Sequence, residues 1–255
     1  MYSFSVIETF TNAAVNLVSG ITDLEVVTAG GVTRLYSATR AGGGVMAIDV
    51  GASMVKIDEV LTATNTVLPA PAELELVTLG GRASMMVSGA NMSRQGGYRI
   101  DADGTIGQGL SYSGSLPGVV SAMESLVLGA DTYFFLARSN ESSIHTYRYV
   151  AATQQMQAVA KLDLGPNLSG IDLTTLLAVE AHGQRYLVAT SLVGDVLRSF
   201  AVAADGTLTP AGVLGAAQGL GLTDPADVKS VVMDGVTYLV MAGSQSSSIS
   251  VVCAA

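Results

Sequence analysis

The sequence has no tryptophan, one cysteine and three lysines among its 255 residues. The single cysteine, Cys253, excludes a disulfide within the chain and a cysteine-rich metal site. Lysine accounts for three of the twelve basic side chains, and the other nine are arginine. Together the twelve basic and 21 acidic side chains give a net charge of −9. This charge argues against nucleic-acid binding through phosphate neutralisation and against a basic membrane-binding surface.

The N-terminus also lacks targeting features. Its first residues, MYSFSVIETFTN, have neither the basic start nor the long apolar stretch of a cleavable signal peptide. No apolar run reaches the roughly 18 residues of a transmembrane helix, so membrane insertion is not expected. An acidic, lysine-poor chain rich in small residues is typical of exported proteins. We therefore predict a secreted or cell-surface location without a cleavable signal peptide.

What the sequence does contain is a repeat. Five apolar runs each end in a small residue, and these residues are Ala38, Ser88, Ala137, Ala189 and Ala242. Successive members are 50, 49, 52 and 53 residues apart. A steady period near fifty residues indicates a repeat architecture.

Each repeat holds four short apolar runs separated by tight turns. The first repeat begins with LEVVTAG (Leu24–Gly30), and a glycine turn leads to the run that ends at Ala38. Alternation of apolar and polar residues with period two predicts strands, and Gly or Asp-Gly between runs predicts hairpins. Four-stranded antiparallel sheets repeated at this period are typical of a β-propeller.

We therefore predict an all-β fold, a β-propeller of about five four-stranded blades that forms a single domain over residues 1–255. The repeats are expected at residues 21–68, 69–117, 118–168, 169–221 and 222–255, the last together with 1–12. A β-sandwich, or a pair of them, would explain the strands and turns but not the period.

The fifth repeat is incomplete, since the chain ends within its third run. The segment Tyr2–Phe10 is strand-like and precedes the first repeat without a partner. The sequence favours a ring closed by this N-terminal strand, which would become the outer strand of the last blade. The alternative is that the chain is a fragment of a longer propeller.

Three sequence segments resemble known families: DLEVVTAGGVTRLYSATRAGGGVMAIDV, FAVAADGTLTPAGVL and GVTYLVMAGSQSSSISV. They resemble the propeller region of bacterial secreted RTX (haemolysin-type calcium-binding) proteins, and their pattern is similar to lactonase-type propellers of the phosphogluconolactonase kind. The resemblance spans nearly the whole chain and implies the fold. The calcium-binding repeat GGxGxDxUx of the RTX family is absent, so its calcium-dependent folding is not implied.

The sequence offers no catalytic or metal-ligating set. Its two histidines, His145 and His182, occupy different strand positions in neighbouring repeats and are expected to be ordinary surface residues. No Gly-x-Ser-x-Gly motif occurs. The stretch DADGT, with Asp101 and Asp103, resembles the start of a calcium loop but lacks a later Glu, and a hairpin turn is the better interpretation. We expect no metal and no cofactor.

The loops after the five apolar runs vary most between repeats, and such loops carry binding sites on rigid scaffolds. Arg40 and Arg138 lie at similar offsets in two of them, and arginine suits carboxylates or sugar acids. The alternative is that both pair with acids such as Glu25, Glu75 or Glu124 and hold blades together. The predicted ligand-binding residues are Arg40, Asn91, Arg138, Asn140, Ser191 and Ser244.

The scarcity of histidine and of clustered carboxylates favours a non-enzymatic function. We predict a binding or adhesion module of an exported or surface-associated bacterial protein, with a glycan or protein ligand on its loops. The alternatives are a lactonase-like hydrolase and a structural module of a larger surface or particle assembly.

Overall fold

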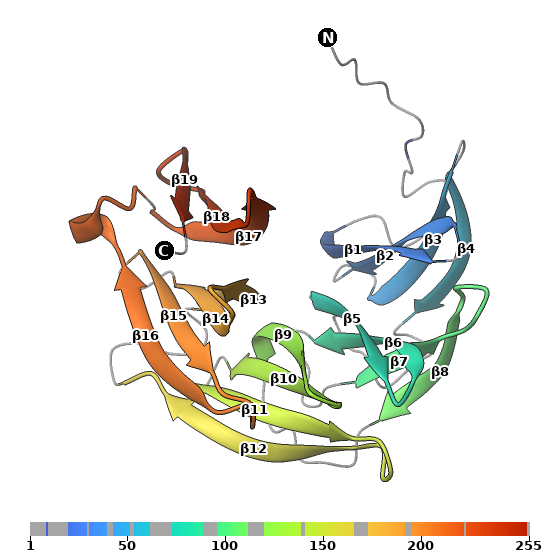
Figure 1. The fold of residues 1–255 in the computed structure, drawn as a ribbon. Coiled ribbons are helices and arrows are strands. Elements are labelled where there is room, and N and C mark those ends of the chain that lie inside the picture. The colour runs from blue at the N-terminus through green and yellow to red at the C-terminus, as the bar shows by residue number, and fades with distance from the viewer. Residues whose placement is uncertain are drawn as a thin grey trace. The chain divides into compact units, whose positions relative to one another are not determined.

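The computed structural model describes residue 9 and residues 20–29, 31–39, 43–51, 54–61, 73–88, 96–111, 120–138, 141–165, 173–191, 195–221 and 223–253. The chain divides into two compact units, Met1–Val119 and Val120–Ala255. Nearly all described secondary structure is antiparallel β-sheet (Figure 1).

The first unit holds two four-stranded sheets, each with its strands paired in chain order. The strands of the first sheet are β1 (Ile21–Ala29), β2 (Val32–Thr39), β3 (Gly44–Val50) and β4 (Met54–Leu61). Those of the second sheet are β5 (Glu73–Leu79), β6 (Arg82–Ser88), β7 (Gly96–Ile100) and β8 (Ile106–Ser111).

The second unit holds three sheets. The third sheet contains β9 (Val120–Leu128), β10 (Asp131–Arg138), β11 (Ser143–Val150) and β12 (Gln155–Asp163). The fourth contains β13 (Leu173–Ala181), β14 (Gln184–Ser191), β15 (Val196–Val202) and β16 (Leu208–Leu214). The fifth contains β17 (Pro225–Met233), β18 (Val236–Gly243) and β19 (Ser248–Cys253).

The five sheets confirm the predicted repeat, and each predicted apolar run that ends in a small residue is the second strand of its sheet. The fifth sheet has three strands among the described residues, as its incomplete repeat suggested. Of the expected closing strand at Tyr2–Phe10, all but Thr9 lies outside the described residues, and Thr9 is exposed and not in a strand. Closure of the ring, and the alternative of a longer propeller, therefore stay predictions.

In the second, third and fourth sheets, turns join the first strand to the second, and the third to the fourth, at the same end of the sheet. We call this the hairpin end, and the opposite end, where the second strand leads into the third, the loop end. Gly206 illustrates the backbone requirement at the hairpin end, because its φ of 81° lies in the left-handed region that side chains disfavour. One short 3-10 helix, Ala216–Gln218, follows β16 and is an element that the sequence interpretation missed.

Hydrophobic side chains fill the space between the two sheets of the first unit. Tyr36 and Tyr98 are the largest of them, and both are nearly inaccessible to solvent. The buried cluster consists of Tyr36, Ala38, Val45, Ala47, Leu74, Met85, Val87, Tyr98 and Ile106. At about 25 cal/mol per Å² of apolar surface removed from water, this burial is the main force that holds one sheet against the next.

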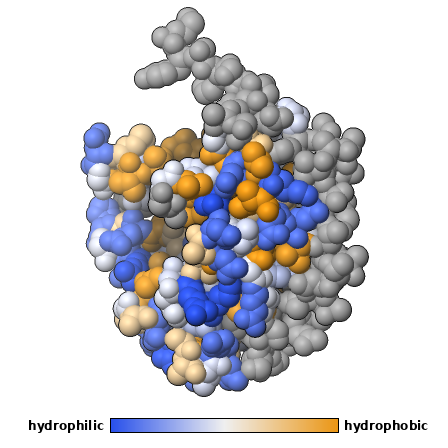
Figure 2. All heavy atoms as spheres, turned by 90° about the vertical axis from the view of Figure 1, so that its right-hand side faces the viewer, coloured by the Kyte–Doolittle hydropathy of each residue, from blue (hydrophilic) through white to orange (hydrophobic). Residues whose placement is uncertain are grey.

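Two clusters do the same in the second unit. One joins the third and fourth sheets around Phe135 and Phe200, and the other joins the fourth and fifth sheets around Val228 and Met241. Within the described residues, no helix is long and apolar enough to cross a membrane. The visible face of the molecule in Figure 2 carries hydrophobic and hydrophilic residues side by side.

Side chains also bond directly to the backbone of the neighbouring sheet. Asp23 accepts a hydrogen bond from the backbone N–H of Leu74 at 2.7 Å, and Asp58 accepts one from that of Ile106 at 2.8 Å. In the second unit, the hydroxyl of Thr237 donates to the carbonyl of Glu180 at 2.7 Å. These bonds satisfy backbone groups at sheet edges, which would otherwise be costly to bury.

Gly206 also packs against the neighbouring sheet. A Cβ atom added there would lie 2.7 Å from Cε1 of Tyr133, a buried residue of β10. We expect Gly206→Ala to destabilise the protein by about 2–4 kcal/mol, because left-handed backbone strain adds to displacement of the ring. Gly129→Ala is the matched control, since Gly129 also has positive φ but no neighbour within 4 Å, and it should cost about 1–2 kcal/mol. Urea denaturation measures both values, and equal losses would contradict the packing role.

Candidate functional site

The structure describes three of the six predicted ligand-binding residues. Arg40, Asn91 and Asn140 lie outside the described residues. Ser191 is fully buried, and Ser244 is exposed, where its hydroxyl donates to the carboxylate of Asp224 at 2.6 Å. Arg138 is 6% exposed. The ligand-binding role of these residues stays a prediction.

Arg138 belongs to a group of charged side chains at the loop end of the third sheet. Its Nη1 lies 2.5 Å from Oε1 of Glu141, in the loop that follows β10. Glu141 Oε2 lies 2.8 Å from His145 Nε2 and 3.3 Å from Lys161 Nζ. Arg138 thus pairs with an acid of its own loop, whereas the alternative interpretation named blade acids such as Glu25, Glu75 or Glu124. His145, expected at the surface, is half-buried, and 15% of its side chain is exposed.

The balance of forces on Glu141 favours its ionised form. Burial raises the pKa of Glu141, but hydrogen bonds from His145, Ser143 and Lys161 and the charge of Arg138 outweigh burial and lower the pKa to about 2. The arrangement is not a nucleophilic triad. Ser143 Oγ and Glu141 Oε2 both approach the same ring nitrogen, Nε2 of His145, whereas a triad uses the two nitrogens for different partners.

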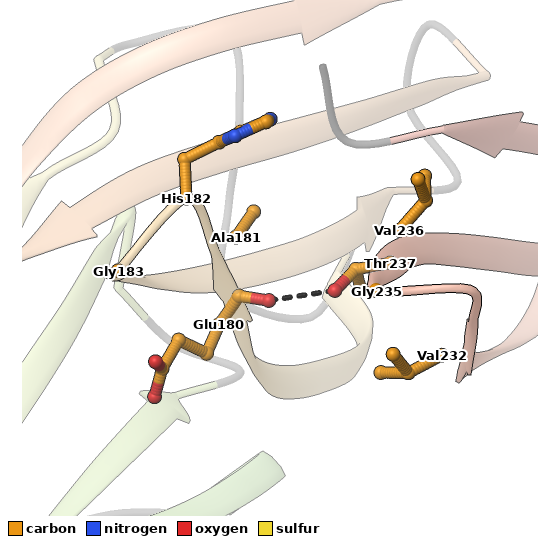
Figure 3. Close-up of a pocket in the computed structure, with 8 residues that line it drawn as sticks. All are labelled: Glu180, Ala181, His182, Gly183, Val232, Gly235, Val236 and Thr237. Carbon is orange, nitrogen blue, oxygen red and sulfur yellow. Dashed lines mark hydrogen bonds between the residues drawn. The ribbon is translucent and has the colours of Figure 1, made fainter.

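The other histidine, His182, lines a cavity of about 430 Å³ at the hairpin end of the second unit. It is exposed, as predicted, and sits in the turn between β13 and β14 with a φ of 52°. Figure 3 shows the imidazole of His182 and the carboxylate of Glu180 pointing away from each other. The cavity therefore holds no acid–base pair formed by these two side chains.

A larger groove, of about 730 Å³, lies between the two sheets of the first unit at their hairpin end. Three arginines line it, Arg34, Arg82 and Arg99, and we call it the arginine groove. The complete lining is Val27, Val32, Arg34, Tyr36, Leu76, Val77, Thr78, Arg82, Ala83, Ser84, Arg99, Ile100, Asp101, Ala102, Gly104 and Gln108. Three of the chain's nine arginines thus meet in one groove of an acidic protein.

The three arginines differ in how they are held. Arg34 is neutralised, because its Nε lies 3.1 Å from Oδ1 of Asp49. Arg99 is fixed by neutral groups, since its Nη1 donates to the carbonyl of Leu79 at 2.9 Å and to Ser84 Oγ at 2.8 Å. Within the described residues, neither Arg99 nor the exposed Arg82 has a carboxylate within ion-pair distance. Two guanidinium groups of the groove therefore have no ion-pair partner among the residues that the structure describes.

Asp101 is the one carboxylate among the lining residues that the structure describes. Its side chain packs over Gly107, where an added Cβ would lie 2.7 Å from Oδ1. The nearby Asp103 is engaged within the turn, because it accepts hydrogen bonds from the backbone and hydroxyl of Thr105 at 3.0 and 2.7 Å. Those bonds lower the pKa of Asp103. DADGT joins β7 to β8 and is a hairpin turn, as predicted. Asp205 makes the same two bonds to Thr207 in the corresponding turn of the fourth sheet.

Tyr36 closes the floor of the groove. Its hydroxyl donates to the carbonyl of Gly104 at 3.0 Å, which ties β2 to the turn between β7 and β8. Burial raises the pKa of Tyr36, and so do Asp49 and Asp103, against the opposing charge of Arg34. The phenol therefore stays protonated and keeps donating this bond.

The sequence interpretation placed binding at the loop end, whereas the arginine groove lies at the hairpin end. None of the six predicted residues lines the groove. A signal for the groove is present in the repeats. Arg82 comes directly after the first hairpin turn of its repeat, and Arg99 comes shortly before the second. Both turns lie at the same end of the sheet.

Comparison with known proteins gives structural matches alone. No family model matches the chain, and no curated protein matches it. A protein from Bacteroides fragilis described as a candidate 6-phosphogluconolactonase is 14% identical, with 89% of this chain and 68% of that chain covered and a TM-score of 0.55. A thermostable family-43 glycoside hydrolase is 10% identical, with coverage of 92% and 89% and a TM-score of 0.59. The catalytic domain of the GH62 α-L-arabinofuranosidase of Coprinopsis cinerea is 9% identical, with coverage of 91% and 89% and a TM-score of 0.59.

The chain has the β-propeller fold. Five repeated antiparallel sheets and these matches agree on that point. Identities this low show the fold alone and carry no activity across, because one fold hosts many functions. The lactonase-like resemblance of the sequence is supported at the level of fold, whereas the resemblance to RTX proteins finds no support in these comparisons.

The charged group around Glu141 predicts a pH dependence of stability. The folded-state pKa of about 2 lies below the ordinary value of 4.5, so its contribution is fully present above pH 4.5 and is lost as the pH falls toward 2. We expect the free energy of unfolding of the wild type to exceed that of Glu141→Gln at pH 6, and the difference to shrink between pH 4.5 and 2. Asp163→Asn, at an exposed position beside Lys161, is the control and should show a smaller change. Parallel pH profiles for wild type and Glu141→Gln would contradict the role of Glu141.

Proposed function

We propose that the protein is a hydrolase of the lactonase kind, which opens a sugar-derived lactone in the arginine groove. The observation that carries the proposal is the lining of the groove, where one carboxylate lies among three guanidinium groups. The fold supports it, since propellers of this kind occur in a candidate 6-phosphogluconolactonase and in glycoside hydrolases. A non-enzymatic binding module, favoured by the sequence, is the second candidate.

The groove suits a lactone better than a glycoside. Glycoside hydrolysis ordinarily needs two carboxylates on either side of the scissile bond. Among the described lining residues, Asp101 is alone, and the nearby Asp49 and Asp103 are engaged with Arg34 and Thr105. Lactone hydrolysis needs one base to activate water and a positive group to stabilise the oxygen that becomes negative.

In the proposed reaction, Asp101 takes a proton from a water molecule as the water oxygen bonds to the carbonyl carbon of the lactone. The guanidinium of Arg99, fixed by Leu79 and Ser84, stabilises the negative carbonyl oxygen of the tetrahedral intermediate. The intermediate collapses, the ring carbon–oxygen bond breaks, and the leaving alkoxide takes the proton from Asp101. Lactone and water thus give a hydroxy acid, with Asp101 restored.

The test compares hydrolysis of δ-gluconolactone with that of aryl glycosides. We expect lactone opening above the spontaneous rate. We expect Asp101→Asn to lower the catalysed rate by roughly 10²–10⁴-fold, which is the usual contribution of a general base to the rate. Acid release in a pH-stat measures the rate.

Asp103→Asn is the matched control, because asparagine keeps the oxygen that accepts from Thr105, and it should retain activity. Gly107→Ala should lower activity without removing the carboxylate, because it displaces the Asp101 side chain. A folded protein with no lactone turnover would contradict the proposal, and sugar-acid binding without turnover would favour the second candidate.

A further inference from the structure

The third sheet has an acid at the position that corresponds to Arg82. Asp131, the first residue of β10, pairs in register with Leu128, and Arg82, the first residue of β6, pairs in the same way with Leu79. One strand further on, Arg148 lies opposite Tyr133 and Arg99 lies opposite Ser84, again at matching places. Position by position, Arg82 corresponds to Asp131, and Arg99 corresponds to Arg148.

In the third sheet the two positions form an ion pair. Arg148 Nη1 lies 3.4 Å from Oδ2 of Asp131, and Arg148 Nη2 donates to Gln157 at 2.9 Å. In the second sheet the carboxylate of this pair is replaced by a second guanidinium. Like charges at neighbouring positions repel, and an anion bound between them would turn this repulsion into attraction.

A backbone contact places the guanidinium of Arg99 beside the strand position of Arg82. Arg99 Nη1 donates to the carbonyl of Leu79, and Leu79 is the direct register partner of Arg82. Both side chains line the arginine groove. Arg99 is fixed by its two neutral acceptors, while Arg82 is exposed at the turn and can adjust to a ligand.

We infer that Arg82 and Arg99 form a carboxylate-binding subsite, which holds the acid group of an open-chain sugar acid in the arginine groove. A planar carboxylate matches the donor fork of each guanidinium, and arginine is the residue type that binds carboxylates through two parallel hydrogen bonds. The polar Gln108 and Thr78 of the same lining can bond to hydroxyl groups. The anion site is inferred from the arginines alone. The choice of a sugar acid as its ligand rests on the proposed function, because a sugar acid is the product of lactone opening.

The probe for this subsite is D-gluconate, with sorbitol as its neutral counterpart on the same carbon skeleton. Isothermal titration calorimetry of the wild type should show gluconate binding that weakens as sodium chloride rises, and no sorbitol binding at the same concentrations. Arg82→Gln should weaken gluconate binding roughly ten-fold, the effect of losing one charged hydrogen bond. Arg185→Gln removes an arginine from the second strand of another sheet and should leave gluconate affinity unchanged.

The decisive variant is Arg82→Asp, which restores the ion pair seen in the third sheet. It should abolish gluconate binding while the melting temperature without ligand stays the same or rises, because the repulsion between the arginines becomes attraction. This variant therefore separates loss of the site from loss of the fold. Gluconate binding that survives in Arg82→Asp would overturn the subsite.

Two further outcomes separate the parts of the inference. Inorganic phosphate that displaces gluconate at equal concentration would overturn the assignment of a sugar acid, because the site would then recognise any oxyanion. Gluconate binding that depends on Arg82, in a protein without lactone turnover, would support the subsite and contradict only the proposed hydrolase. Turnover that persists while gluconate fails to bind would contradict only the subsite.

Discussion

A four-stranded antiparallel sheet has two faces, and a chain built from such sheets is stable only where each face is covered by another sheet. In the first unit, the large side chains Tyr36 and Tyr98 fill the space between neighbouring sheets. The polar groups follow from this packing. Asp23 and Asp58 bond to backbone N–H groups of the next sheet, because burial of the interface leaves those groups without water. The grooves at the hairpin ends are places where this packing is incomplete.

The repeat made the fold predictable. Small residues at a steady spacing placed the second strand of each sheet, and Gly or Asp-Gly pairs placed the turns, because few other residues accept the backbone conformation that a tight hairpin needs. The DADGT turn is an example, since its hydrogen bonds depend on residues two apart in sequence. The 3-10 helix at Ala216–Gln218 was missed because one turn of helix leaves no periodicity to detect.

The candidate site was not predictable by the same reasoning. Arg82 and Arg99 lie on different strands, and Arg34 lies on another sheet, so their meeting depends on how two hairpin ends pack. The sequence interpretation instead followed loop variability, which led to Arg138. That arginine is buried, and Glu141 takes up its charge. A periodic pattern of apolar residues predicts strands, but it does not predict which charged side chains pair in the segment between two strands. Alignment of whole repeats, rather than of their apolar runs, would have shown an arginine where the third sheet has Asp131.

The scarcity of lysine has a consequence for how the groove responds to its surroundings. The positive groups of the groove are all guanidiniums, the side-chain type that keeps its charge in proteins. An amine in the same place would lose its charge when desolvated, and an imidazole would lose it near neutrality. The cationic side of the groove is therefore constant. A change of affinity with pH therefore cannot come from loss of charge on the arginines of the groove.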